Sequence, residues 1–168
     1  ADNAHVHVII LSGRGNAFCA GYDLNAFANE KNNSLTQKMP WDPIKDYRFM
    51  WQNNEHFMSL FNCLKPVICK IHGIGALAGG SDIALCSDFI FMENDAKIGY
   101  MPTRVWGTPT TAFWMYRLGP EKAKRMLFTG DKISGLEAEK LGLVLKAASK
   151  ETLDNEVDSF AMRMTTVP

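Results

Sequence analysis

The sequence predicts an α/β fold, in which short buried strands alternate with helices. Short apolar runs bounded by turn residues are typical of buried strands, and longer stretches with apolar residues three or four positions apart are typical of helices. The predicted strands or extended segments are residues 5–11, 66–71, 89–92, 97–102 and 143–145. The predicted helices are residues 47–64, 81–87, 110–118, 121–128 and 151–164, with a short one between Ser134 and Gly142. This alternation of strands and helices is typical of the α/β class.

The first third of the chain holds a strand, a polar segment and a long helix. Residues 5–11 (HVHVIIL) alternate at first and then become fully apolar, as a strand entering a core does. Residues 25–46 are polar and show no period, and such a long loop in a compact domain is usually a lid or mobile. Residues 47–64 carry methionines and aromatics at helical spacing, which we interpret as a core-facing side rather than cofactor contacts.

The middle of the chain runs from a predicted strand, through a glycine-rich turn, into a helix. Four glycines crowd together before the helix of residues 81–87: Gly73, Gly75, Gly79 and Gly80. The first N–H groups of a helix have no internal partner, and the helix dipole adds partial positive charge there. Glycines let a ligand approach those N–H groups. The pattern therefore favours a site for an anion, or for an oxygen that becomes anionic during a reaction.

Turn chemistry divides the last third of the chain. Gly119 and Pro120 end one predicted helix before the next begins. Ser134 with Glu137 three residues later is a capping box, and Gly142 closes the short helix that follows.

Composition excludes several classes of function. The chain has 168 residues, of which 46% are hydrophobic and 21% charged, with 18 basic and 18 acidic side chains. A neutral chain without a basic run argues against nucleic acid or an anionic membrane as the main partner. No apolar run is long enough to span a bilayer. Four cysteines without C-x-x-C spacing indicate reduced thiols in a cytoplasmic protein, and we expect no metal.

The glycine-rich turn leaves three hypotheses open. One is a tight connection without a ligand. Another is a dinucleotide site, because Gly73-x-Gly75-x-x-Ala78 fits the G-x-G-x-x-G/A pattern and Glu93 follows about 20 residues later. The third is an oxyanion hole for a thioester carbonyl. His72, beside these glycines, is a candidate for catalysis or for a hydrogen bond to loop backbone.

Six separated motifs occur together in one order. They are residues 17–24 (AFCAGYDL), 65–68 (KPVI), 78–84 (AGGSDIA), 86–88 (CSD), 96–99 (AKIG) and 129–134 (TGDKIS), the last followed by 141–144 (LGLV). In order and approximate spacing they resemble the enoyl-CoA hydratase/isomerase (crotonase) family. The dinucleotide hypothesis explains only one of the six.

The resemblance implies a crotonase-like fold of ββα repeats stacked as a spiral. Residues 1–168 would form a single core domain without the family's N-terminal strands and C-terminal helices, since both ends of the chain look cut. The implied substrate is an acyl-CoA thioester of fatty acid metabolism, with coenzyme A as part of the substrate and no other cofactor. The implied assembly is a homotrimer or a dimer of trimers.

The resemblance also implies which residues act. The backbone N–H groups of Tyr22 and Gly79 would bind the thioester oxygen and stabilise an enolate. Substrate and CoA would contact both segments around these donors: Ala20, Tyr22, Asp23, Leu24, Asn25, Gly79 and Gly80.

The chain differs from the family at the two positions where hydratases of the family carry glutamates. Hydratases of this family use two glutamates to hold water and move protons. Here the first position is Asp82, in the first turn of a helix, where the dipole favours its ionisation. It is either the general base or an ordinary helix charge. The second position is Thr103, which we count among the candidate catalytic residues although it cannot act as an acid or base at neutral pH. Tyr100 is a possible proton donor and Arg104 a possible anion anchor.

These departures leave two classes of function open beside the remote dinucleotide-binding domain. The chain is either an enzyme that hydrates or isomerises an enoyl-CoA, or a catalytically weakened acyl-CoA-binding subunit. Because one carboxylate is missing, the two-glutamate hydratase mechanism is the doubtful part, and chemistry with a single base remains open.

Overall fold

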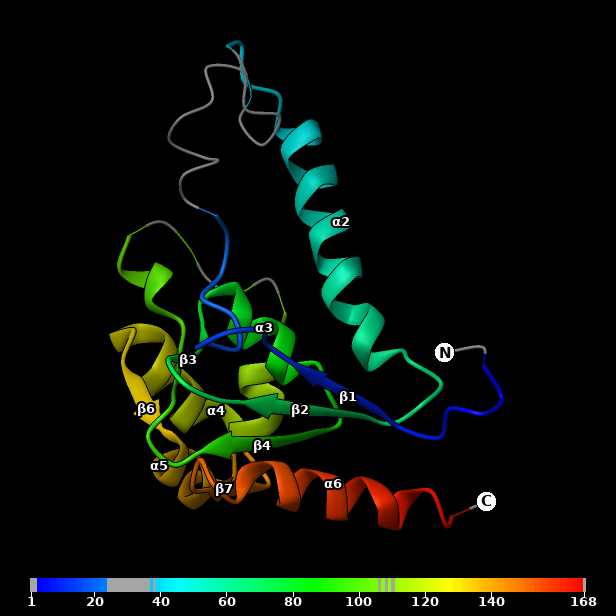
Figure 1. Ribbon diagram of the computed structural model, residues 1–168. Coiled ribbons are helices and arrows are strands. Elements are labelled where there is room, and N and C mark those ends of the chain that lie inside the picture. The colour runs from blue at the N-terminus through cyan, green and yellow to red at the C-terminus, as the bar shows by residue number, and fades with distance from the viewer. Residues whose placement is uncertain are drawn as a thin grey trace.

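The computed structural model describes residues 3–23, 37, 39–105, 107, 109 and 111–167. Within them the chain forms two sheets, and helices pack against both faces of the larger one (Figure 1). The predicted α/β class is confirmed.

The larger sheet has four parallel strands in the order β1, β2, β4, β7. They span Ile9–Ser12 (β1), Val67–Ile71 (β2), Phe89–Glu93 (β4) and Lys146–Ala148 (β7). The two central strands are apolar and largely buried, as expected for a parallel sheet covered on both faces. All four carboxyl ends therefore meet at one edge of this sheet.

A smaller sheet continues the central strands after a bend. In it β3 (Gly75–Leu77) lies parallel to β5 (Lys97–Gly99), and β5 pairs antiparallel with β6 (Lys132–Ser134). The order strand, short strand, helix therefore occurs twice, as β2-β3-α3 and again as β4-β5 followed by η1 and α4. This repetition is the ββα arrangement that the resemblance implied.

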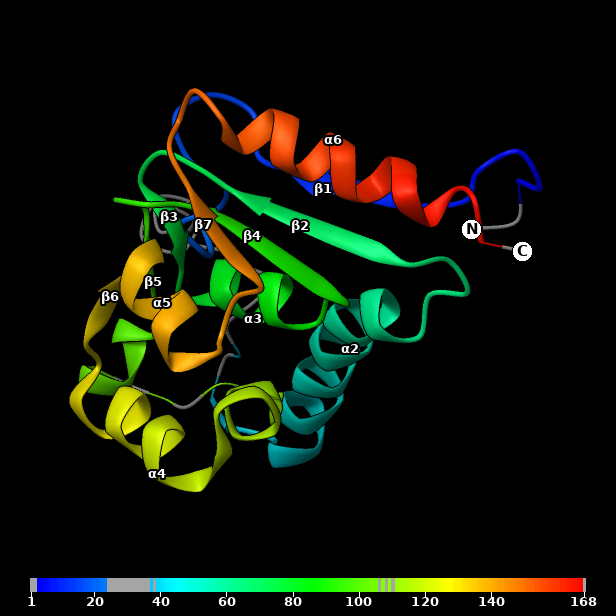
Figure 2. The ribbon, with the colours of Figure 1, turned by 90° about the horizontal axis from the view of Figure 1, so that it is seen from below.

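An apolar cluster lies on each face of the larger sheet, and helices cover both clusters (Figure 2). The main cluster joins one face of the sheet to α3 (Gly79–Leu85), α4 (Phe113–Thr129) and α5 (Gly135–Leu141). On the other face α6 (Leu153–Met164) packs across β2 and β4. Among the helices of the described residues, none combines the length and the apolar character that a bilayer crossing requires.

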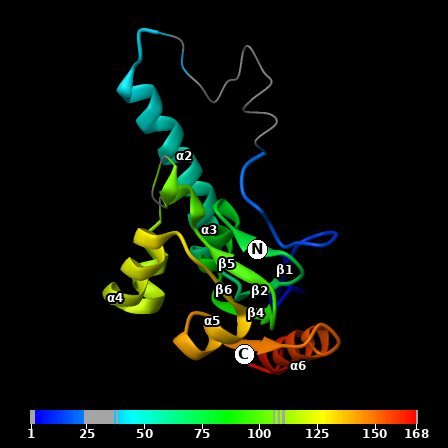
Figure 3. The same cartoon turned by 90° about the vertical axis from the view of Figure 1, so that its left-hand side faces the viewer.

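The long helix α2 (Pro43–Phe61) leans away from the two sheets (Figures 1 and 3). It begins earlier than predicted because the Asp42 side chain accepts a hydrogen bond from the N–H of Ile44, and a proline fits the first turn. No residue of α2 is fully buried, but Phe57 and Met58 pack against the main cluster. The predicted core-facing side is therefore confirmed only near the C-terminal end of α2.

Two strand predictions need correction, and two short strands were missed. β1 begins at Ile9 rather than at residue 5. The predicted strand at 143–145 is wrong, because Leu143 and Val144 are buried in the turn after α5 and the strand is β7. The strands β3 and β6 were not predicted, since three residues are too few to show a period.

Local turn signals were more dependable. The helices predicted on either side of Gly119 and Pro120 form α4, which has a non-helical kink at Gly119. The hydroxyl oxygen of Ser134 accepts a hydrogen bond from the N–H of Glu137, and Gly142 ends α5 in a left-handed conformation. Both predictions are confirmed.

Candidate active site

The loop that follows β1 runs along β3 and brings two distant segments together. Backbone hydrogen bonds join Cys19 N–H to the carbonyl of Gly75 (3.2 Å) and Leu77 N–H to the carbonyl of Cys19 (2.9 Å). These bonds carry the next residues of the loop, Gly21 and Tyr22, to the start of α3.

The contact between the segments is close. A Cβ atom on Gly21 would lie 3.0 Å from Cβ of Ala78 and 3.4 Å from the backbone nitrogen of Gly79. A Cβ atom on Gly79 would lie 3.8 Å from Cε2 of Tyr22. The structure thus brings together the two segments that were predicted to hold the oxyanion donors, while the binding of a carbonyl by these N–H groups stays a prediction.

The start of α3 offers hydrogen-bond donors. Ala78 precedes the helix with φ 51° and ψ −127°, a conformation that non-glycine residues rarely adopt, and its own N–H donates to the carbonyl of Gly99. The N–H groups of Gly79 and Gly80 have no acceptor among the described residues. These are the donors that a helix start leaves free for a ligand.

Asp82 is a buried carboxylic acid on α3, with only 2% of its surface exposed. No lysine, arginine or histidine of the described residues forms an ion pair with it. Burial raises its pKa from 3.8 to about 7, and a hydrogen bond from Thr111 lowers the pKa in part. The helix dipole was expected to favour ionisation, but desolvation is the larger effect. A carboxyl group that titrates near neutral pH suits a general base.

Two tyrosines lie close enough to Asp82 to sense its charge. Burial, and then the charge of Asp82, raise the pKa of Tyr22, and the same causes raise the pKa of Tyr100 to about 12. Both phenols therefore keep their protons at neutral pH. Tyr100 packs partly against the main apolar cluster, while about half of Tyr22 is exposed.

The residue predicted at the second carboxylate position, Thr103, forms a structural contact. Thr103 lies in η1 (Met101–Arg104), and its hydroxyl donates to the carbonyl of Leu127 at 2.7 Å. Arg104 is exposed, donates to the carbonyl of Thr129 and pairs with Asp131. Both side chains tie η1 to the end of α4. A catalytic role for Thr103 stays a prediction.

The other predicted substrate contacts lie on the same two segments. Ala20 and Asp23 are exposed on the loop on either side of Gly21 and Tyr22. Leu24 and Asn25 lie outside the described residues. One residue of the site was missed: Thr111 contacts Asp82 from a point 29 residues further along the chain, and no local pattern announces such a contact.

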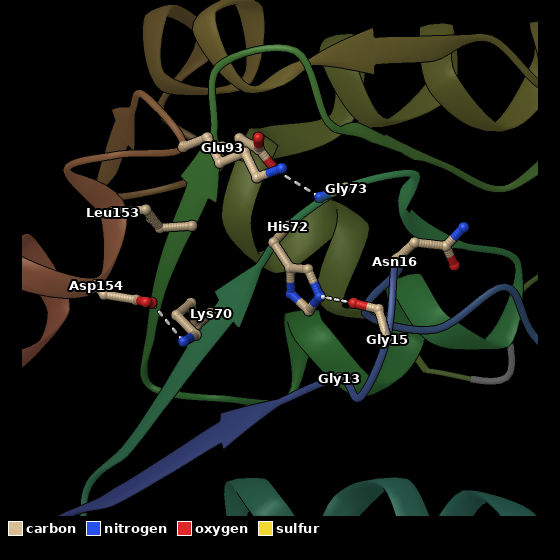
Figure 4. Close-up of a pocket in the computed structure, with 10 residues that line it drawn as sticks. Gly13, Gly15, Asn16, Lys70, His72, Gly73, Glu93, Leu153 and Asp154 are labelled. Carbon is tan, nitrogen blue, oxygen red and sulfur yellow. Dashed lines mark hydrogen bonds and ion pairs between the residues drawn. The ribbon is translucent and has the colours of Figure 1, made fainter.

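A separate hollow of about 460 Å³, here called the sheet-edge pocket, lies at the carboxyl ends of β1, β2 and β4 (Figure 4). Lys70 pairs with Asp154 at 2.5 Å, and the N–H of Gly73 donates to Glu93 at 2.5 Å. Nε2 of His72 lies 3.0 Å from the carbonyl oxygen of Gly15, as one of the two hypotheses for this histidine predicted. The residues that line it are Gly13, Gly15, Asn16, Lys70, His72, Gly73, Glu93, Lys150, Leu153 and Asp154.

Known proteins share both the sequence and the fold. The enoyl-CoA hydratase/isomerase family profile matches residues 1–168. The chain is 30% identical over 167 residues to a crotonyl-CoA hydratase of Syntrophomonas wolfei, an alignment that covers 97% of the chain and 60% of that protein. It is 32% identical over 165 residues to a peroxisomal Delta(3,5)-Delta(2,4)-dienoyl-CoA isomerase of Arabidopsis thaliana, covering 95% and 59%. The crystal structure of an enoyl-CoA hydratase from Mycobacterium smegmatis superposes with a TM-score of 0.89 at 42% identity, covering 99% of this chain and 59% of that one.

The chain spans about three fifths of the length of these relatives. The prediction of a single domain over residues 1–168, without the flanking strands and helices, stays a prediction. The profile match and the shared architecture agree with the six motifs. This chain belongs to the enoyl-CoA hydratase/isomerase family and has the crotonase fold.

Proposed function

We propose that this protein processes an enoyl-CoA thioester by stabilising an enolate, with Asp82 as the base. The observation that carries the proposal is a buried carboxyl group with a pKa of about 7 on a helix whose first N–H groups have no acceptor among the described residues. A base and an electrophilic donor are the two parts that proton abstraction beside a thioester needs.

The proposed reaction moves a proton and a double bond within the substrate. Asp82 removes a proton from the carbon beside the thioester. The electron pair of the broken C–H bond forms a double bond to the carbonyl carbon, and the carbonyl π electrons move onto the thioester oxygen. The N–H groups of Gly79 and Tyr22 donate to that oxygen, and the loss of one such donor typically costs about 3–4 kcal/mol. The proton then returns from Asp82 to another carbon of the same system, which moves the double bond.

Isomerisation fits the described residues better than hydration does. Moving a double bond needs one base that takes and returns a proton, whereas hydration by two glutamates needs a second carboxylate. Thr103 stands where that carboxylate is expected, and its hydroxyl donates to a backbone carbonyl. Relatives named as a hydratase and as an isomerase are about equally similar to this chain. Hydration with Tyr100 as the proton donor is the second candidate, supported by the proximity of its phenol to Asp82.

The remaining parts of the proposal rest on the family resemblance. They are a homotrimer or a dimer of trimers, a cytoplasmic location, and no cofactor beyond the coenzyme A of the substrate. The non-catalytic alternative is an acyl-CoA-binding subunit in which Asp82 is only a buried acid.

The test replaces Asp82 by asparagine, which keeps the shape of the side chain and removes the base. We expect Asp82→Asn to lower turnover of enoyl-CoA substrates by about 100-fold or more, because general base catalysis typically contributes that much. Acyl-CoA affinity, measured by calorimetry, should change little. The matched control is Asp154→Asn, at an exposed carboxylate of the sheet-edge pocket, which should keep full turnover.

Proton exchange in heavy water separates the alternatives. Entry of deuterium at the carbon beside the thioester in the wild-type protein, lost in Asp82→Asn, supports the proposal. Tight acyl-CoA binding with neither label nor turnover in the wild type indicates the non-catalytic subunit. Full activity of Asp82→Asn would show that Asp82 is not the base.

A further inference from the structure

A buried hydrogen bond joins Asp82 to the segment that precedes α4. The hydroxyl of Thr111 donates to Oδ1 of Asp82, with 3.3 Å between the oxygens. Both residues are buried, with 8% of Thr111 and 2% of Asp82 exposed. Both partners of the bond therefore have little contact with solvent.

The groups that surround Asp82 make this bond important. Among the described residues, the ionisable side chains whose pKa is raised by its charge are Tyr22, Tyr100 and Cys86, and all three hold their protons at neutral pH. Near the start of α3, the α2 helix contributes the apolar ring of Phe57, and β3 carries no ionisable side chain.

The charged residue of α4 that contacts α3 is Arg117, and its hydrogen bonds go to backbone carbonyls rather than to Asp82. Arg117 donates to the backbone carbonyls of Leu85 and Ser87, at the C-terminal end of α3. The carboxylate of Asp82 is therefore stabilised by a neutral hydroxyl and not by a cation among the described residues.

We propose that Thr111 is a positioning residue for Asp82: its hydroxyl holds Oδ1, fixes the rotation of the carboxylate, and leaves Oδ2 to exchange the proton with the substrate. The terminal torsion of an aspartate is broad, so that without a partner the two oxygens would exchange places readily. Threonine is suited to this role because its branched Cβ restricts the first side-chain torsion and holds the hydroxyl in place.

The role also follows from the length of the base. An aspartate is one methylene shorter than the glutamate of related hydratases, so it has less freedom to find a reacting carbon. Misplacement of a catalytic group by about 1 Å can cost 100-fold in rate. A hydrogen bond that fixes one oxygen keeps the other at a defined position.

The test compares Thr111→Val, which keeps the shape and removes the donor, with Thr111→Ser, which keeps the donor. This part rests on the proposed function, since it measures turnover of an enoyl-CoA. We expect Thr111→Val to lower kcat roughly 10- to 100-fold, the range that corresponds to losing a hydrogen bond to a charged group. KM should change little, and the acidic limb of the kcat profile should move to higher pH, because the ionised form of Asp82 loses a stabilising donor. Thr111→Ser should recover most of the wild-type rate.

A purely structural role for Thr111 predicts a different result. Both variants would then lose thermal stability while the fraction that remains folded kept the wild-type pH profile. Equal kcat and equal pH profiles for wild type and Thr111→Val would overturn the proposal while the proposed function stands.

A titration without substrate tests the coupling independently. In protein labelled with ¹³C at the aspartate carboxyls, the Asp82 signal is identified by its loss in Asp82→Asn. We expect Thr111→Val to raise the pKa of that signal and Thr111→Ser to leave it near the wild-type value. If the pKa rises but no enoyl-CoA is turned over, the proposed function has failed and the coupling is supported. An unchanged pKa contradicts the coupling whatever the activity.

Discussion

The start of α3 and the sheet-edge pocket differ in the number of their ionisable side chains and in the partners that these side chains have. The pocket is lined by five residues that can carry a charge, and α3 presents one, Asp82. In the pocket, Lys70 and Asp154 form an ion pair, and Glu93 accepts a backbone N–H. Asp82 has a neutral hydroxyl as its hydrogen-bond donor and a pKa raised to about 7. Two opposite charges that pair with each other are therefore a weaker sign of chemistry than one buried acid that has no ion-pair partner among the described residues.

The two regions also differ in how much room each leaves for a side chain at its glycines. A Cβ atom on Gly73 would lie 2.0 Å from the carbonyl oxygen of Asn16, so the fold itself excludes any side chain there. A Cβ atom on Gly79 would meet Tyr22 only at an ordinary 3.8 Å. Packing therefore does not require glycine at position 79, and access of the ligand to its N–H is the reason that we propose.

The largest expected effect tests this contrast between Gly73 and Gly79. Gly73→Ala should lower the free energy of unfolding by about 4 kcal/mol or more, because backbone atoms must move and the residue has a φ of +61°. Gly79→Ala should leave that free energy unchanged within about 1 kcal/mol. Urea unfolding followed by circular dichroism measures both.

The same pair of variants separates stability from activity. Gly79→Ala should fold normally and lose most of its turnover, since the added methyl group stands beside the proposed donor. A Gly79→Ala protein with full activity would remove the Gly79 N–H from the mechanism.

The second effect concerns stability against pH. Between about pH 4 and pH 7 the folded protein holds a proton on Asp82 that the unfolded chain has lost. The free energy of unfolding therefore falls as pH rises through this window, by about 4 kcal/mol in total. Asp82→Asn should remove this fall, and should be more stable than the wild type at pH 8 but not at pH 4.

The sheet-edge pocket supplies the control for that measurement. Asp154→Asn changes a carboxylate whose side chain is 72% exposed, so it should keep the wild-type slope between pH 4 and pH 7. Parallel curves for Asp82→Asn and the wild type would contradict the raised pKa of Asp82.

The smallest effect is expected from the ion pair of the pocket. Lys70→Ala, Asp154→Ala and the double variant form a cycle that isolates the interaction of the two side chains. Because Lys70 and Asp154 are 23% and 72% exposed, solvent screens the pair, and the coupling should stay below about 1 kcal/mol. Thermal unfolding at low and high salt measures it, and a coupling of several kcal/mol would show that the pocket is less screened than its exposure indicates.

Local signals in the sequence predicted the central strands, the break at Gly119 and the cap at Ser134. Each depends on residues within a few positions, so the information is present before the chain folds. The short strands β3 and β6 were missed because they are defined by the neighbours they pair with.

The candidate site divides along the same line. The order and spacing of the motifs in the sequence were enough to select the family, and they predicted the two segments around Tyr22 and Gly79 and Asp82 as the candidate base. Only the tertiary structure decided how that acid behaves. The helix dipole was expected to lower the pKa of Asp82, but burial among residues from distant segments raises it. Thr111, which donates a hydrogen bond to Asp82, lies 29 residues further along the chain. Desolvation depends on everything that surrounds a group in space, and no stretch of sequence records those surroundings.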